Sequence, residues 1–155
     1  MTMKTNRTAR TLIYLGTLPF VFALLIASYD YMNVSTYIDY NINFARFKSY
    51  AIAHSYGSII VAFLAGIQWG VSLHQDDTKR YFIISNLLAL LAWISLGAFA
   101  SFTGISILLF CFLLALLIDR HAFHADIIPD WYWQLRKNVT LCVVVTLILL
   151  LIFNK

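Results

Sequence analysis

The residues most able to do chemistry gather in a polar stretch that contains Asp119, His121, His124 and Arg136. Carboxylate, imidazole and guanidinium groups can move protons, bind anions or, for the first two, hold a metal ion. His121 and His124 are three positions apart and close to Asp126, so a metal site is conceivable. The spacing supplies no rigid third ligand, and no nucleophile or cofactor motif accompanies these residues. We therefore expect no catalytic residue, no cofactor and no metal here, and interpret the histidines as solvated loop residues.

Asp119 and Arg136 have a second interpretation, because they adjoin two apolar stretches. We expect Asp119 to end one membrane helix and Arg136 to begin the next on the same side of the membrane. Each charge would then lie at the helix end that disfavours it, by about 0.3–1 kcal/mol. Pairing would close the two helices against each other. The alternative is two solvated charges at the membrane surface, whose pairing would contribute roughly 0–1 kcal/mol.

Small side chains recur every four residues in the stretch 51–74, at Ser58, Ala62, Gly66 and Gly70. This spacing lines one face of a helix and lets two helix backbones approach closely. We expect the face to pack against a neighbouring helix of the same chain. Contact with a second copy of the chain is the alternative.

Polar and aromatic residues next to this face have simpler interpretations. Gln68 is expected to hydrogen-bond to another helix, with contact to a ligand as the alternative. Trp69 fits the aromatic belt found at membrane surfaces. His54 lies near the opposite end of the same stretch, apart from the other histidines. Pro19 should kink the first apolar helix, because it lacks a backbone N–H and its ring clashes with the preceding turn.

The composition places all these residues in a membrane protein. Of 155 residues, 61% are hydrophobic and 12% are charged, whereas soluble domains carry about 25% charged residues. A soluble fold of this size could not bury so much apolar surface. The net charge of +4 is small, and most positive residues belong to one predicted side of the membrane. This pattern indicates topology, not nucleic-acid binding.

Five stretches are apolar enough to be membrane spans, each needing about 20 residues. Their approximate ranges are 11–28, 51–74, 81–98, 103–119 and 139–153. The 38 residues between Arg80 and Asp119 carry no charge, and as one helix they would be about 57 Å long, nearly twice the hydrocarbon thickness of roughly 30 Å. The chain must therefore fold back, near residues 97–104. The last range is the shortest and could be re-entrant or interfacial.

These ranges predict an all-α bundle of about five transmembrane helices that forms one membrane domain over residues 1–155. With the N-terminus inside, the inner segments carry eight positive residues and the outer segments three. The positive-inside rule therefore favours an N-in, C-out topology. We expect a bacterial inner membrane rather than an organelle membrane.

Two blocks of the sequence resemble a known family. The first runs from Tyr56 to Gly70 and reads YGSIIVAFLAGIQWG, and the second runs from Asp119-Arg120 through Pro129-Asp130-Trp131-Tyr132 to Thr140. Together with Leu15-Gly16 and Pro19-Phe20, they resemble the domain of unknown function 3429 family, which includes transmembrane protein 69-like proteins. A histidine often stands in that family where this chain has Gln68. The resemblance implies the same membrane architecture and no established activity.

The sequence favours a non-enzymatic membrane protein that packs or assembles with itself or with a larger membrane complex. Its expected partners are the lipid bilayer, a second copy or a membrane-complex subunit, and no nucleic acid. The first alternative is an oligomeric transporter or channel, although no ionisable residue lies near the centre of a span. The second is a membrane-embedded enzyme that uses the aspartate, histidines and arginine of the inner surface.

Overall fold

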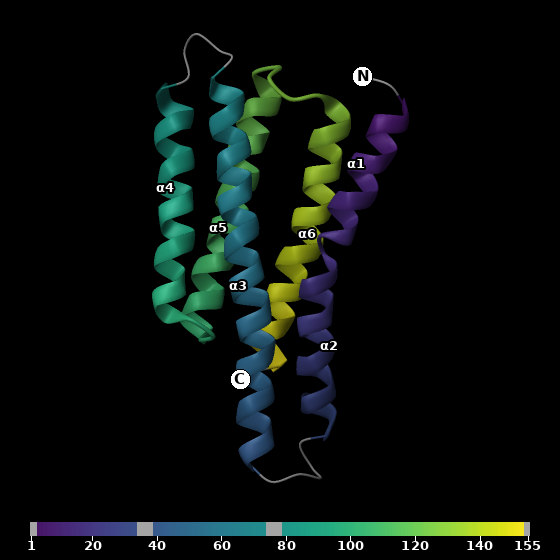
Figure 1. Cartoon of the computed structure of the whole chain (residues 1–155), viewed down its shortest axis with the longest axis vertical. Coiled ribbons are helices and arrows are strands. Elements are labelled where there is room, and N and C mark those ends of the chain that lie inside the picture. Colours follow the sequence, from purple (N-terminus) through teal and green to yellow (C-terminus); the bar gives the residue numbers. More distant parts are fainter. Residues whose placement is uncertain (1–2, 34–38, 74–78, 154–155) are drawn as a thin grey trace.

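The computed structural model describes residues 3–33, 39–73 and 79–153, and in these ranges the chain is helical apart from short turns (Figure 1). The elements are α1 (Met3–Leu15), α2 (Leu18–Asn33), α3 (Asp39–Ser72), α4 (Lys79–Ser95), the short 3-10 helix η1 (Leu96–Ala98), α5 (Phe102–His124) and α6 (Asp130–Phe153). Among the described residues, five helical segments are long and apolar enough to cross a membrane. They are Arg7–Tyr29, Phe47–Val71, Lys79–Ala98, Phe102–His124 and Asp130–Phe153. The predicted all-α, multi-pass membrane architecture is thus confirmed.

The first spanning segment is broken between α1 and α2, as Pro19 predicts. Helix α1 ends at Leu15, and Thr17 caps this end through its hydroxyl, which donates to the carbonyl oxygen of Tyr14 at 2.8 Å. Pro19 follows in the first turn of α2, where a missing N–H costs least. As a result α1 leans away from the axis of α2 (Figure 1).

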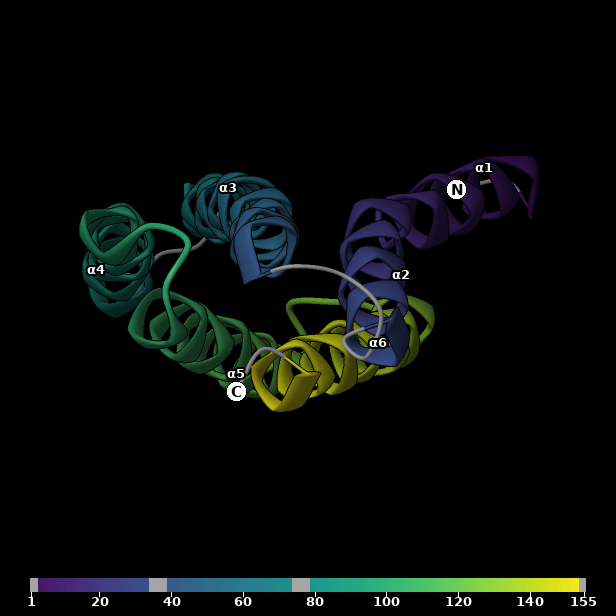
Figure 2. The ribbon, with the colours of Figure 1, turned by 90° about the horizontal axis from the view of Figure 1, so that it is seen from below.

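Helix α3 is the central element of the bundle. It packs against α2, α4 and α5 and scarcely touches α6, which lies across from it in the end-on view (Figure 2). With 34 residues it is about 51 Å long, and together with α2 it extends beyond the turn between α4 and α5 (Figure 1). Helix α3 is therefore long enough to contact both α4 and α5, which carry polar residues described below.

The turn between α4 and α5 lies where the sequence predicts it. Helix α4 ends at Ser95, and α5 begins at Phe102 after η1. Ser101 caps α5, because its hydroxyl accepts a hydrogen bond from the backbone N–H of Gly104 at 3.1 Å. Ala100 adopts a left-handed backbone conformation with φ of 52°, which is costly for a residue with a Cβ.

Helices α5 and α6 are longer than the apolar ranges 103–119 and 139–153. Helix α5 continues to His124, and α6 begins at Asp130 and contains 24 residues. The reason is that backbone hydrogen bonding continues through polar residues near a membrane surface, so a helix need not end with its apolar run. Asp119 and Arg136 consequently lie within these helices. The expectation that they lie at the helix ends is wrong.

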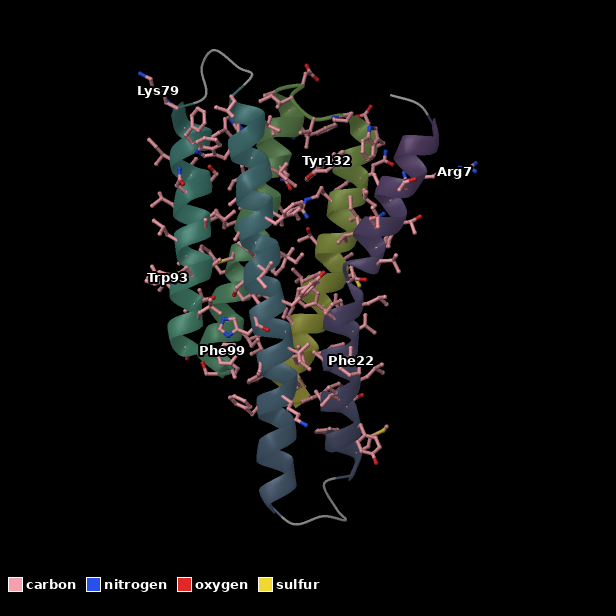
Figure 3. The ribbon with its side chains drawn as sticks, in the orientation of Figure 1. Arg7, Phe22, Lys79, Trp93, Phe99 and Tyr132 are labelled. Atoms are coloured by element: carbon pink, nitrogen blue, oxygen red, sulfur yellow. The ribbon has the colours of Figure 1, made fainter. Side chains whose placement is uncertain are left out.

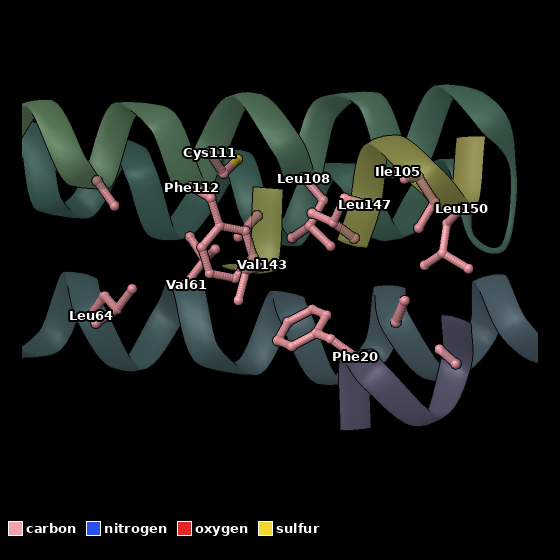
Figure 4. Packing of buried hydrophobic residues seen from close by; sticks show 14 of the residues in the cluster. Phe20, Val61, Leu64, Ile105, Leu108, Cys111, Phe112, Val143, Leu147 and Leu150 are labelled. Carbon is pink, nitrogen blue, oxygen red and sulfur yellow. The ribbon is translucent and has the colours of Figure 1, made fainter. Parts of the chain in front are cut away.

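Aromatic and aliphatic side chains form the core between α2, α3, α5 and α6 (Figure 4). Phe20 follows the break and lies edge-on against Phe112 of α5, with ring centroids 5.8 Å apart. The outer surface is equally apolar: Phe22 and Trp93 point away from the bundle (Figure 3). An apolar exterior of this extent is typical of helices surrounded by lipid.

Candidate functional site

A buried ion pair links α5 to α6. Nε of Arg136 donates to Oδ2 of Asp119 at 2.7 Å, and the two residues are only 5% and 6% exposed. Asp119 lies five residues before the end of α5 and Arg136 six residues after the start of α6, which is about 8–9 Å along each helix. At this depth the ions interact in a low dielectric and lose much of their hydration, so each depends on the other.

The short connection between α5 and α6 places the two residues of this pair close together. The N–H of Ile127 donates to the carbonyl oxygen of Ala122 at 3.0 Å, and the N–H of Asp126 donates to that of Phe123 at 3.1 Å. These bonds form a Schellman motif in which Asp126 takes the left-handed position, with φ of 55°. Only residues 125–129 separate the two helices, so α6 returns directly alongside α5.

Gln68 extends the ion pair to α3. Its Nε2 donates to Oδ1 of Asp119 at 3.1 Å, so the two oxygens of that carboxylate accept from two different helices. Gln68 is 7% exposed. This contact is the helix-linking role expected for Gln68. Three helices thus meet at one carboxylate.

A small cavity adjoins this cluster on the side of the α5–α6 connection. Gln68, Asp119, Tyr81 and Tyr132 supply its polar lining, and its volume is about 30 Å³. A polar cavity needs roughly 10–15 Å³ to hold one water molecule. The buried hydroxyl of Tyr81 has no hydrogen-bond partner among the described residues. The cavity is therefore large enough for one or two water molecules beside the cluster.

A larger cavity, which we call the lateral groove, lies on the other side of Arg136. It has a volume of about 330 Å³, and α1, α2, α3, α5 and α6 contribute to its walls. Its lining residues are Leu12, Ile13, Gly16, Thr17, Phe20, Tyr56, Ile60, Phe63, Leu64, Ile67, Phe112, Tyr132, Arg136, Val139, Thr140 and Val143. Pockets for small molecules have volumes of roughly 300–1,000 Å³ and are mostly apolar with a few placed polar groups. The lateral groove fits this description.

Two polar atoms of α6 are buried beside the lateral groove. Nη2 of Arg136 and Oγ1 of Thr140 are buried and make no hydrogen bond within the described ranges. The two residues are four positions apart, so they lie on the same face of the helix. A buried donor without a partner costs about 1–3 kcal/mol.

A second polar cluster, which the sequence interpretation missed, joins α3 to the turn between α4 and α5. Nδ1 of His54 accepts from the backbone N–H of Ala100 at 3.3 Å, and Nε2 lies 3.0 Å from the hydroxyl of Ser95. The Ser95 hydroxyl donates to the carbonyl oxygen of Ala92, so Nε2 is the donor to Ser95. The imidazole also stacks on Phe99, with centroids 5.6 Å apart. His54 therefore holds the strained turn in place.

The small-residue face of α3 is turned toward α4 but is enclosed only in part. Ser58 is buried, 3.5 Å from the hydroxyl of Ser95, but Ala62 and Gly66 are exposed. A Cβ added at Gly66 or Gly70 would meet nothing within 4 Å. Beyond Ser58 the face borders a hollow that it shares with Ser85, Asn86 and Ala89 of α4, so its contact with that helix is loose there. Nearby Trp69 is exposed and lies edge-on against Phe82 of α4.

The polar residues that could have formed an enzyme site are not gathered in one place. Asp119 and Arg136 face the interior, whereas His121 and His124 are exposed. His121 lies beside the ring of Tyr81, and His124 lines a surface hollow with Lys137. Within the described ranges, no three His, Cys, Asp or Glu residues are close enough together to hold a metal ion. His74 lies outside the described residues.

Comparison with known proteins gives one match. The model of the family described as "Protein of unknown function (DUF3429)" matches residues 5–152, nearly the whole chain. No curated protein and no solved structure matches. The match includes α1 to α6 almost completely, and with them the ion pair, Gln68 and the lateral groove.

Proposed function

We propose that this chain, which belongs to the DUF3429 family of proteins of unknown function, binds a membrane-dissolved amphiphile in its lateral groove without transforming it. The observation that carries the proposal is the polar end of that groove. Arg136 and Tyr132 lie at one end of a cavity of about 330 Å³ whose other walls are mainly aliphatic and aromatic. A molecule with one polar end and an apolar body matches both parts.

The position of the groove supports entry from the bilayer. Leu12 of α1 and Phe63 of α3 line it and are 62% and 64% exposed, so they form its rim. Both residues lie within segments suited to crossing a membrane. Hydrocarbon would surround this rim, and an amphiphile could enter sideways without passing through water.

The chemistry of the lining supports binding rather than catalysis. The described polar side chains of the groove are the hydroxyls of Thr17, Tyr56, Tyr132 and Thr140 and the guanidinium of Arg136. The Thr17 hydroxyl is engaged with a backbone carbonyl, and Arg136 is held by Asp119. The hydroxyls of Tyr56 and Tyr132 and the guanidinium of Arg136 can position a ligand through hydrogen bonds. A general base or an activated nucleophile would need a partner arrangement that this lining does not supply.

Blocking the groove tests this proposal. The protein is purified in a mild detergent, and its extractable small molecules are identified by mass spectrometry. Ile60→Trp places an indole in the groove, whereas Ile59→Trp places the same group on the exposed side of α3. We expect an amphiphile to co-purify with the wild type and with Ile59→Trp and to be lost from Ile60→Trp. Equal recovery from both variants, or recovery from none of the three proteins, would contradict the proposal.

A second candidate function is assembly with another copy of the chain, as the small-residue face suggests. The open space at Gly66 and Gly70 favours it, because a second helix could approach α3 closely there. Gly66→Cys tests this candidate, since a close symmetric contact would allow a disulfide between two copies. A protein that stays monomeric under oxidation in membranes would argue against such assembly.

A further inference from the structure

A hollow on the surface of α5 and α6, which we call the basic hollow, has a volume of about 490 Å³. Its lining residues are Leu116, Leu117, Arg120, His124, Trp133 and Lys137. None of them lines the lateral groove, so this site is independent of the proposed function. We infer that the basic hollow binds the phosphate headgroup of an anionic phospholipid whose acyl chains lie along α5 and α6.

Two positive charges in the basic hollow are available to an anion from outside the chain. Arg120 and Lys137 are exposed, and neither forms an ion pair with an acidic side chain of the described residues. The carboxylate of Asp119, next to Arg120 in the sequence, is buried and paired with Arg136. Nζ of Lys137 lies 5.3 Å from the ring centroid of Trp133, and this cation–π contact holds the charge against the wall.

The donors of the basic hollow suit a phosphate group. A guanidinium can donate to two phosphate oxygens at once, and an ammonium group adds a second charged donor. His124 lies four positions after Arg120 on the same face of α5, where a ring N–H can donate to a third oxygen. A phosphate can belong to a lipid headgroup or to a small water-soluble molecule, and the surroundings of the basic hollow favour the lipid.

The charges lie at the depth of lipid headgroups. Arg120 comes two positions after the charge-free stretch 81–118, and Lys137 comes two positions before the apolar range 139–153. Both therefore lie at the border of the hydrocarbon, next to the headgroup layer. Arg7 and Lys79 mark the end of the bundle that the positive-inside rule assigns to the inner surface (Figure 3), and α5 joins α6 at this end (Figure 1). Basic pockets between membrane helices on that side bind anionic headgroups.

Two exposed apolar faces lead from the basic hollow into the hydrocarbon. On α5, Leu117 lines the hollow and Leu113 lies four positions deeper, and both are exposed. On α6, Leu141 and Val145 continue the face of Lys137 at the same spacing and are exposed too. Because α5 and α6 run in opposite directions, both faces extend from the hollow toward the same side (Figure 1). A phospholipid, with one charged head and two chains, matches this arrangement, whereas a free phosphate would use only the head.

Native mass spectrometry of the protein in a mild detergent tests the inference. The dissociation constant of the first bound lipid is compared for dioleoylphosphatidylglycerol and dioleoylphosphatidylcholine, which differ in the charge of the head. A first double variant, Arg120→Gln with Lys137→Gln, removes both charges of the hollow. The matched control, Lys79→Gln with Arg80→Gln, removes two exposed charges at the start of α4, outside the hollow. A third double variant, Arg120→Lys with Lys137→Arg, keeps the charge and tests whether a loss comes from charge or from misfolding.

We expect the wild type to bind phosphatidylglycerol about five- to thirtyfold more tightly than phosphatidylcholine, as two basic groups near a membrane surface would give. This preference should disappear in the first double variant. It should remain in the matched control, in the charge-conserving variant and in Ile60→Trp, which blocks only the lateral groove. Glycerol 3-phosphate in excess should not displace the lipid, because it has no chains.

Equal affinity of the wild type for the two lipids, or an unchanged preference in the first double variant, would overturn the inference. An equal loss in the matched control would assign the preference to net charge rather than to the basic hollow. Displacement by glycerol 3-phosphate would make the hollow a site for soluble phosphates, and a loss in Ile60→Trp would move the lipid to the lateral groove. Each of these three results would also overturn the inference, and the proposed function would be judged separately by the amphiphile that co-purifies.

Discussion

Nε of Arg136 lies 2.7 Å from Oδ2 of Asp119, and through this contact the second turn of α6 is held against the second-last turn of α5. The same carboxylate accepts a hydrogen bond from Gln68 of α3. Removing one member leaves the other charge buried without compensation, and such changes cost about 3–5 kcal/mol. The ion pair is therefore the first target for mutation.

A double-mutant cycle with Asp119→Asn and Arg136→Gln measures the strength of the pair. Each single variant should lose more than half as much free energy of unfolding in detergent as the double variant loses. The coupling energy should be at least about 1 kcal/mol. Additive losses would show that the contact contributes nothing beyond two separate side chains.

Gly104 and Gly66 are expected to respond oppositely to alanine. A Cβ at Gly104 would collide with the carbonyl oxygen of Ala98 and lie 2.5 Å from Cε1 of His54, whereas at Gly66 it would meet open space. Gly104→Ala should destabilise the protein by about 1–3 kcal/mol, the usual cost of overpacking. Gly66→Ala should be neutral or stabilise it by up to about 1 kcal/mol through helix propensity. Thermal unfolding in one detergent compares the two, and a loss at Gly66 would reveal a contact with another chain.

His54 should control the order of the turn between α4 and α5. His54→Leu keeps most of the volume but leaves the N–H of Ala100 without its acceptor. We expect a loss of about 1–3 kcal/mol and faster hydrogen exchange of residues 96–101. Ser106→Ala is the control, because that exposed hydroxyl donates only within α5, to the carbonyl oxygen of Phe102. Unchanged exchange in His54→Leu would mean that η1 and Ser101 hold the turn by themselves.

Asp126→Gly should stabilise the connection between α5 and α6. Asp126 has φ of 55°, a conformation that glycine adopts without a steric penalty. We expect a gain of up to about 1 kcal/mol, because relief of the left-handed strain outweighs the greater entropy of glycine in the unfolded chain. Ala125→Gly is the matched change at φ of −92°, where glycine brings no such relief and should lower stability slightly. Denaturant unfolding of both variants checks the difference in sign.

The N-in, C-out topology remains a prediction that the arrangement of charges favours. Arg7 and Lys79 lie at the same end of the bundle (Figure 3), as the positive-inside rule requires of residues on one side. In bacterial cells, a reporter that works only in the cytoplasm should be active when fused to the N-terminus and inactive at the C-terminus. Activity at both ends would remove one crossing and leave an even number.

The sequence by itself determined the features that depend on local composition. The charge-free run between Arg80 and Asp119 required two helices and a turn, because one helix of that length would greatly exceed the hydrocarbon thickness. Pro19 predicted the break in the first spanning segment, because its ring and its missing N–H disturb the adjacent helical turn whatever the rest of the fold. The contact between Asp119 and Arg136 could be anticipated too, since a short connection between antiparallel helices leaves them few other neighbours.

Only the tertiary structure decided how each helix is rotated about its axis. Lipid accepts apolar side chains as readily as a protein interior does, so a spanning helix is apolar on all sides and carries no pattern that marks its inner face. For this reason the spacing of Ser58, Gly66 and Gly70 did not reveal that only the first of them is enclosed. For the same reason Thr140 could not be assigned to the groove beside Arg136, or His54 to the turn at Ala100, until the helices were packed together.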